Sequence, residues 1–372
     1  MASIECIKST LKGTDIEIIS SKRWKHEKLH NNAEFIKKTI NLIDINDRKY
    51  KYISDVGNRY AKLIHNDMSL EYEKNVRNLQ MYEVLRNLDG LINKHTGLDK
   101  LKKTDSDKAP RLSHREIGCF NVMSISKNND DILLFNQFIN DYNIEWDWYV
   151  FGFLSNGPHR KKYSVGIEGD GMTSVANIRY TKISMGNIIN LCILGEFTLA
   201  NVMMGISVLK NGGALIVPSF DVRQVDEKSK NLQNLNTLYL LSMHFEKISI
   251  IDPFVSEYPY NRTYLICENY KEINASVLSR ILELLDKDLK THEVIDFGAS
   301  EEFIDQYSDI YDNLIKERGK KILADIELIE QYKNLEISEL PKSMKNKYKI
   351  YMNMWIDQFK FVELEDIDKL HL

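Results

Sequence analysis

The chain has 372 residues, of which 43% are hydrophobic and 28% are charged, so its composition is that of a globular protein and excludes a mainly disordered one. A chain of this length can bury one substantial core with added helices, or two modest domains. The formal net charge of −4 excludes binding of nucleic acid through a strongly basic overall charge, although a local basic patch is compatible with it.

The first part of the chain, residues 1–75, is polar and reads as a partly helical extension. Asn32–Ile43 and Arg59–His65 carry helix-like spacing of apolar residues. The pattern is stronger in Glu71–Leu91, where the apolar side chains recur on one side of a helix. We place the start of the main domain, residues 76–272, inside this helix.

A strand, a helix and a second strand follow, which is the unit that builds a doubly wound parallel sheet. We predict the first strand at Arg115–Val122, the helix at Ile132–Tyr142 and the second strand at Asp147–Leu154. After them come a basic cluster, Arg160, Lys161 and Lys162, and a glycine-rich segment that contains Asp170.

The stretch from Leu191 to Tyr270 is the most regular part of the sequence. We predict, in order, an apolar helix, a glycine turn that ends it, a buried strand, a second helix and two strands: Leu191–Leu209, Asn211–Gly213, Ala214–Val217, Leu235–Phe245, Lys247–Ile251 and Thr263–Cys267. The last two strands are close enough in sequence to pair as an antiparallel ribbon at the end of a mainly parallel sheet. The fold class is therefore α/β.

The remaining residues, 273–372, are highly charged and predict an appended C-terminal helical region. Helical spacing covers Ser276–Leu289, Glu301–Tyr332 and Ser343–Phe359.

Cysteine usage and hydropathy indicate the compartment. Four cysteines lie far apart, without a CxxC or Cys/His cluster, which predicts no metal site and, for Cys119, Cys192 and Cys267, small core residues in a reducing compartment. No apolar segment has the length of a signal peptide core or of a membrane span, so we expect a cytoplasmic protein without a membrane partner.

Two segments carry a resemblance to a known family. The sequences LKNGGALIVPSF (Leu209–Phe220) and MHFEKISIIDPFVSEYPYNRTYLICENY (Met243–Tyr270) resemble the C-terminal half of FtsJ-like RNA ribose 2′-O-methyltransferases, including those of large DNA viruses. The spacing from Pro253 to Tyr264 matches the final motif of that family without a gap. The resemblance implies a Rossmann-like methyltransferase fold that binds S-adenosylmethionine.

In that family, a Lys-Asp-Lys-Glu set activates the ribose hydroxyl, because nearby cations favour its alkoxide. The resemblance places the first lysine at Gln80, the second at Pro218 and the glutamate at Arg262. None of these three residues keeps the charge that the family has. The arginine of the final motif falls on Glu257, which is also a reversal of charge.

The family aspartate has two open placements: Asp170 itself, or a position near Ser184 if Asp170 belongs to an earlier turn. For the methyl donor, the resemblance implies Glu116, Gly118 and Asp170 as the cofactor-binding positions. Cys119 and Phe120 would narrow the space in which the backbone has to approach the donor.

We therefore expect a methyltransferase scaffold that has lost its chemistry and binds no cofactor. The leading hypothesis is a structural or stimulatory subunit in viral mRNA capping or in RNA processing, partnered by a catalytic subunit and located in the cytoplasm, a viral factory or the virion. The first alternative is an active cap ribose 2′-O-methyltransferase that uses S-adenosylmethionine, with Lys182 or Lys210 replacing the missing lysine. The second is an RNA-binding module that uses Arg160–Lys162 and Lys22–Lys28.

Overall fold

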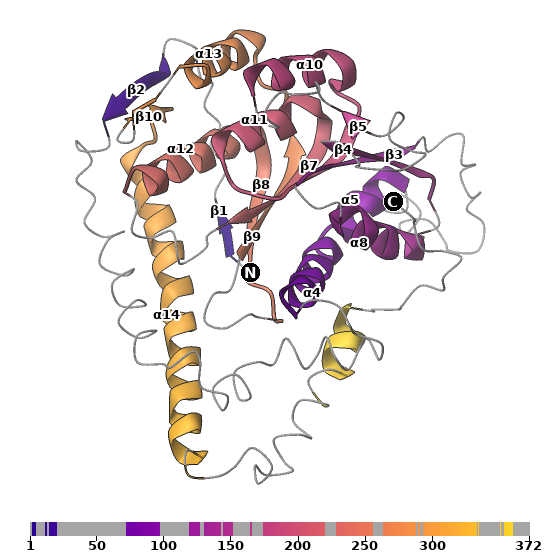
Figure 1. Ribbon diagram of the computed structural model, residues 1–372, viewed down its shortest axis with the longest axis vertical. Coiled ribbons are helices and arrows are strands. Elements are labelled where there is room, and N and C mark those ends of the chain that lie inside the picture. The colour runs from indigo at the N-terminus through magenta and orange to yellow at the C-terminus, as the bar shows by residue number, and fades with distance from the viewer. Residues whose placement is uncertain are drawn as a thin grey trace, which may run out of the picture.

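A computed structural model of the chain describes residues 2–4, 12, 15–20, 72–96, 119–126, 130–142, 144–151, 164–165, 174–219, 228–255, 263–287, 289–290, 293–332, 334, 350 and 353–359 (Figure 1). The predicted helical segments Asn32–Ile43 and Arg59–His65 lie outside these residues.

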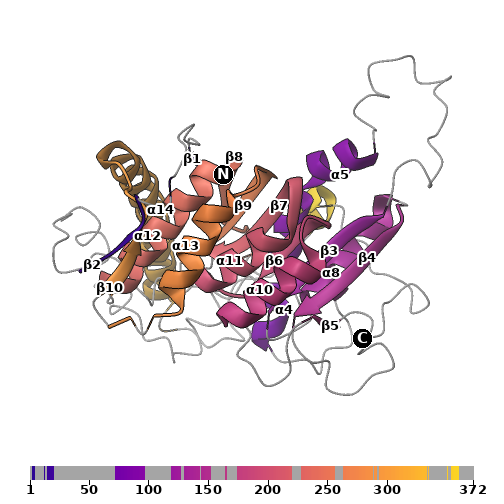
Figure 2. The ribbon, with the colours of Figure 1, turned by 90° about the horizontal axis from the view of Figure 1, so that it is seen from above.

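The described strands form a central eight-stranded sheet in the order β1-β8-β9-β7-β6-β3-β4-β5 (Figure 2). Their bounds are β1 Ala2–Ile4, β3 Phe120–Ile125, β4 Trp146–Phe151, β5 Ser164–Val165, β6 Ile189–Leu194, β7 Leu209–Ser219, β8 Phe245–Ile251 and β9 Thr263–Tyr270. Strands β5, β4, β3, β6 and β7 run parallel. Strand β9 lies between β7 and β8 and is antiparallel to both. This is the Rossmann-like methyltransferase fold that we predicted, with a mainly parallel sheet and an antiparallel final strand.

Helices cover both faces of the sheet (Figure 1). One face packs against α10 (Val175–Met185), α11 (Leu199–Val208) and α12 (Lys228–His244). The other packs against α4 (Tyr72–Arg86) and α8 (Asp130–Ile139), the latter followed by a 3₁₀ turn, Asn140–Tyr142. Because both faces are covered, the central strand β6 is buried at every position, and five of its six residues are apolar, the exception being Asn190.

The prediction of one helix over Leu191–Leu209 is wrong in its first part. Leu191–Leu194 belongs to β6, and α11 begins only at Leu199, where the side chain of Thr198 accepts a hydrogen bond from the backbone N–H of Asn201. A strand that is buried on both faces does not alternate between polar and apolar residues. Its continuous apolar sequence therefore looks the same as that of a buried helix.

The glycine turn also lies elsewhere than expected. Asn211–Gly213 falls inside β7 and does not end a helix. Gly212 has φ +80°, and the register between β6 and β7 shifts beside it, so these residues form an irregularity in the strand.

The first core strand is displaced from its predicted place at Arg115–Val122, since β3 starts at Phe120 and runs to Ile125. The other predicted elements are confirmed over their described residues: Glu71–Leu91 as α4, from Tyr72, and α5 (Asp89–Thr96), Ile132–Tyr142 as α8 and its 3₁₀ turn, Asp147–Leu154 as β4 up to Phe151, Ala214–Val217 within β7, Leu235–Phe245 within α12, and the last two strands as β8 and β9.

Both ends of the chain contribute to the folded body. β1 pairs with β8, and β2 (Glu17–Ser20) pairs with β10 (Glu293–Asp296). As predicted, the C-terminal region is helical, with α13 (Ala275–Leu285) and α14 (Glu301–Tyr332). α13 and the first half of α14 pack on the same core as α12, whereas the far half of α14 extends away from the sheet (Figure 1). The limits of the three regions at 75 and 272 stay predictions.

Candidate functional site

The candidate site lies where the parallel strands end. In doubly wound sheets, ligands bind outside the carboxyl ends of the strands, at the point where the strand order reverses. Here that point lies between β3 and β6, because the chain moves from β3 through β4 to β5 and then returns to the other side of β3. We call the side on which β3, β4, β6 and β7 end the carboxyl edge. β8 also ends there, because β7 and β8 are both antiparallel to β9.

The ends of β3 and β6 are in close contact at the reversal point. The backbone N–H of Gly195 donates to the carbonyl oxygen of Ile125 at 2.9 Å. A Cβ atom built on Gly195 would lie 2.7 Å from the Cβ of Ser126. Position 195 therefore has no room for a side chain. The single glycine after an apolar run was the sequence signal for this contact, and our sequence reasoning did not use it.

Acidic residues follow β3 at the start of α8. Asp131 is buried, and its carboxylate accepts a hydrogen bond from the Ser124 hydroxyl at 3.4 Å, while that hydroxyl also lies 3.2 Å from the hydroxyl of Ser126. A carboxylate at a helix N-terminus interacts favourably with the helix dipole. The same negative charge opposes a phosphate group, which helix N-termini otherwise attract.

The predicted donor-binding turn does not lie after the first strand. β3 begins at Phe120, so Cys119 lies directly before the amino end of that strand. The Phe120 ring is buried against the ring of Phe135. The prediction that Cys119 and Phe120 narrow a donor cleft at the carboxyl edge is therefore wrong. Glu116, Gly118, Asp170, Glu257, Arg262 and the basic cluster Arg160–Lys162 lie outside the described residues, so their roles stay predictions.

Gln80 lies in a turn of α4 that is buried on all sides. Every residue from 79 to 85 is buried, and Gln80 itself is 2% exposed. Its side-chain Nε2 is a buried donor without a hydrogen-bond partner. The position at which the resemblance places a lysine is thus filled by a neutral, buried amide.

Glu83, one turn further along α4, is the polar centre of this face, and our sequence reasoning gave it no role. Its carboxylate accepts hydrogen bonds from the backbone N–H groups of Phe254 (2.6 Å) and Val255 (2.9 Å), just after β8, and from the indole N–H of Trp355 (2.7 Å). Burial raises the pKa of Glu83 to about 7, although all three hydrogen bonds act to lower it. The sequence signal was an acid within an otherwise apolar helical turn.

Pro218 lies at the carboxyl end of β7, where it faces Tyr264 of β9. β6 pairs with β7 only as far as Ile216, so Pro218, which has no backbone N–H to donate, lies beyond the part of β7 that is paired on both sides. This residue brings neither a charge nor a side-chain donor to the carboxyl edge.

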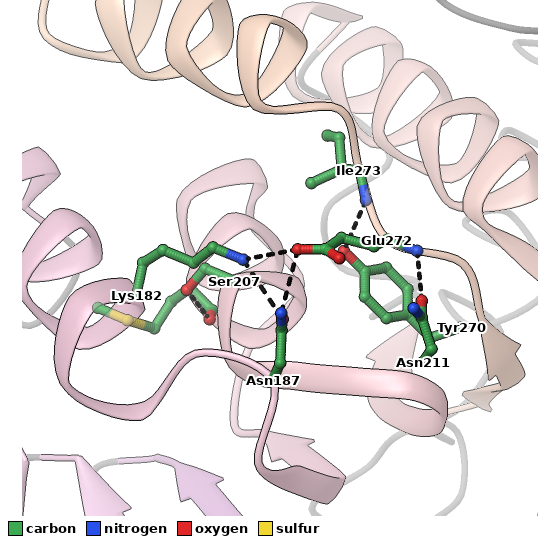
Figure 3. A network of polar contacts seen from close by, with 8 residues as sticks. Lys182, Asn187, Ser207, Asn211, Tyr270, Glu272 and Ile273 are labelled. Carbon is green, nitrogen blue, oxygen red and sulfur yellow. Dashed lines mark hydrogen bonds and ion pairs between the residues drawn. The ribbon is translucent and has the colours of Figure 1, made fainter.

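The two lysines that could have replaced the family lysine lie at the amino edge instead. Lys210 is in the first part of β7, eight residues before Pro218, which is roughly 25 Å along a strand. Lys182, in the last turn of α10, forms an ion pair with Glu272 at 3.3 Å (Figure 3). Glu272 in turn donates its backbone N–H to Asn211, the neighbour of Lys210. Neither lysine can therefore act at the position of Pro218.

The alternative placement of the family aspartate near Ser184 is wrong for a related reason. Ser184 lies within α10, ahead of β6, and its hydroxyl donates to the backbone carbonyl of Tyr180 at 2.9 Å. This residue precedes a parallel strand and so lies away from the carboxyl edge.

The described residues offer neither a metal centre nor a membrane span. No group of three or more His, Cys, Asp or Glu side chains in the described part of the chain is arranged to hold a metal ion. Among the same residues, no helix is both long and apolar enough to cross a bilayer.

Comparisons with known proteins add little to this geometry. No protein-family model and no curated protein matches the chain. Among solved structures, it is similar to the CMeT domain of the citrinin polyketide synthase, with 10% sequence identity, a TM-score of 0.27, and coverage of 66% of this chain and 89% of that one. A structural similarity this low supports no conclusion about the chain. The fold assignment therefore rests on the order and direction of the strands.

Proposed function

We propose that the chain is a non-catalytic methyltransferase-fold protein that acts as a structural or stimulatory subunit in mRNA capping or RNA processing. One observation carries the proposal: Gln80 and Pro218 supply no ammonium group to the carboxyl edge, and both lysines that could replace one lie at the opposite edge. Without a cation beside it, a ribose hydroxyl keeps its ordinary high pKa and is a poor nucleophile.

Among the described residues at this edge, Glu83 and Asp131 are polar groups that serve the fold itself. Glu83 is saturated by three donors from the chain, and Asp131 lies at a helix N-terminus, where it stabilises the helix. For the partner, we propose a catalytic capping or methyltransferase subunit that docks on the far half of α14. This half carries exposed charges such as those of Glu317 and Lys320.

Isothermal titration with S-adenosylmethionine tests the loss of the donor site. We expect no saturable binding up to millimolar donor and no methyl transfer to capped RNA, with an active FtsJ-like ribose methyltransferase as the positive control. Low-micromolar binding, or labelled RNA, would overturn the proposal and favour an active enzyme.

The subunit role needs a separate measurement. The chain is added to a guanine-N7 methyltransferase from the same source, and the initial rate of methyl transfer is followed. We expect a rate increase of at least severalfold, which a charge reversal of Glu317 and Lys320 weakens. An unchanged rate would contradict the stimulatory role.

A further inference from the structure

A short helix near the C-terminus, residues 353–359, is attached to α4 through one fully buried side chain. Trp355 is 1% exposed, whereas Met354 beside it is 57% exposed. Asn353, Asp357 and Gln358 are also exposed, and only Ile356 and Phe359 are partly buried. The helix, drawn in yellow, lies beside α4 in Figure 1, far in sequence from the sheet that it covers.

Trp355 makes the central contacts of this attachment. Its indole N–H donates to Glu83 at 2.7 Å, and its ring lies against the rings of Tyr82 and Phe359, with centroids 6.2 Å and 5.4 Å away. The end of the helix is held separately, since the guanidinium of Arg86 donates to the carbonyl oxygen of Phe359 at 2.7 Å. The attachment thus uses Tyr82, Glu83 and Arg86, which lie on one side of α4 within little more than one turn.

The position of these contacts gives the helix a role at the carboxyl edge. Glu83 links three segments: α4, the residues after β8, and residues 353–359. While Trp355 is in place, the Glu83 carboxylate and the N–H group of Val255 are buried, whereas Phe254 is half exposed. If Trp355 leaves, these groups are exposed beside the ends of β8 and β7.

Physical principles indicate that this element opens alone. Among residues 353–359, Trp355 is the buried side chain, and Ile356 and Phe359 are only partly buried. Segments with few buried apolar contacts open locally at lower free energy than core strands. Strands β6 and β7, by contrast, are buried on both faces.

We infer that residues 353–359 form a latch on the carboxyl edge, which Trp355 holds closed against Glu83 and which opens as a local unit while the sheet stays folded. This inference goes beyond the proposed function, because the latch controls access to the edge whether or not the chain transfers methyl groups.

Hydrogen exchange, measured by mass spectrometry on the full chain, tests the latch. In the wild type, we expect amides of residues 353–359 to exchange at least tenfold faster than those of β6 and β7. Trp355→Phe keeps the ring but removes the N–H donor. It should accelerate exchange at 353–359 and at Phe254 and Val255 by at least a further tenfold, without changing β6 and β7. Met354→Ala, on the exposed side of the same helix, is the matched control and should change nothing.

Three results would overturn the latch: equal exchange of residues 353–359 and β6 in the wild type, no effect of Trp355→Phe, or an equal acceleration of the whole sheet by that variant. The wild-type comparison decides the question even if Trp355→Phe does not fold. Glu83→Gln, which replaces one of the two acceptor oxygens by an amide donor, gives a second reading, and its combination with Trp355→Phe should add little to either change alone.

Discussion

At the scale of single residues, burial and hydrogen bonding act in opposite directions on Glu83. Burial raises its pKa to about 7, with a further rise from the negative charge of Asp252, while the donors Val255, Trp355 and Phe254 lower it. The nearest cation along α4, Arg86, is bonded to Phe359 and Tyr82. The folded protein therefore holds a proton on Glu83 at pH values where the unfolded chain, with a pKa near 4.5, has released it.

This shift predicts how stability depends on pH. Because the folded pKa is raised, the stabilisation linked to Glu83 is fully present below pH 4.5 and is lost as the pH rises through 7. A shift from 4.5 to about 7 corresponds to about 3 kcal/mol. Urea unfolding of the wild type between pH 4.5 and 8.5 should show this loss. In Glu83→Gln, the free energy of unfolding should fall less steeply with rising pH, because the contribution of Glu83 is absent. Identical pH profiles for the two proteins would contradict the assignment.

Gln80 offers a second prediction, because its Nε2 is a buried donor without a partner. Replacing such a group by an apolar one of similar shape avoids its desolvation cost, which is about 1–3 kcal/mol. We expect Gln80→Met to leave the free energy of unfolding unchanged or to raise it by about 1 kcal/mol. Gln80→Glu, of nearly the same size, should lower it by several kcal/mol, since it buries a second carboxyl group one turn from Glu83.

Urea unfolding at pH 7 compares the two Gln80 variants directly. A loss of stability in Gln80→Met as large as that in Gln80→Glu would mean that the amide is bonded and contributes to the fold.

The sequence identified some of these residues and missed others for a physical reason. Gln80 and Pro218 were singled out because the residues that flank them resemble a family motif, and their correspondence to catalytic positions stays a prediction. The role of Glu83 could not be found in this way, because its indole partner Trp355 lies 272 residues further along the chain. A contact of that separation leaves no local pattern, so only the folded structure brings it to light.

At the scale of secondary-structure elements, the junction of β6 and α11 decides how closely the strand ends approach. Gly195 follows β6 and lies against Ser126, where a Cβ would be 2.7 Å from another Cβ. Overpacking of this kind costs about 1–3 kcal/mol, because backbone must move to relieve it. We expect Gly195→Ala to lower the free energy of unfolding by about 2 kcal/mol in urea.

Gly90 is the matched control for this substitution. It lies in α5, and a Cβ there would meet no atom within 4 Å. Alanine is favoured over glycine in a helix by up to about 1 kcal/mol, so Gly90→Ala should be neutral or stabilising. If the two alanine variants had equal stability, the contact between Gly195 and Ser126 would not limit the approach of the strands.

The elements themselves were predictable to different degrees. α14 was predicted at its observed bounds, because its apolar residues recur at helical spacing and its other positions are charged. Leu191–Leu194 was assigned to a helix, because a fully buried strand lacks the alternation that reveals a half-buried one. Secondary structure was therefore hardest to predict where burial was greatest.

At the scale of the whole molecule, the two ends of the chain cover different parts of the same sheet. β1 adds its backbone hydrogen bonds to β8, which would otherwise be the edge strand on that side. Residues 353–359 cover the carboxyl edge next to α4. The order of elements along the chain predicted the α/β class, but not these closures, because pairing between distant segments depends on the complete sheet.

We propose that the loss of the donor site involves the whole edge and does not reside in one residue. Three separate features lie at this edge: the contact of Gly195 with Ser126, the acid at the start of α8, and the bond between Trp355 and Glu83. Restoring one lysine should therefore not restore ligand binding. We expect Pro218→Lys, like its uncharged control Pro218→Met, to fold and to show no rise in melting temperature with 1 mM S-adenosylmethionine.

The size of the effect makes this measurement decisive. A ligand present at 100 times its Kd stabilises the folded state by about 2.7 kcal/mol. In a domain of this size, 1 kcal/mol corresponds to a shift of roughly 2–4 °C, so a Kd of about 10 μM would raise the melting temperature by at least about 5 °C at that donor concentration. A rise of this size in Pro218→Lys but not in Pro218→Met would mean that the edge retains a donor site and lacks only its cation. A rise in the wild type as well would mean that the donor site was never lost.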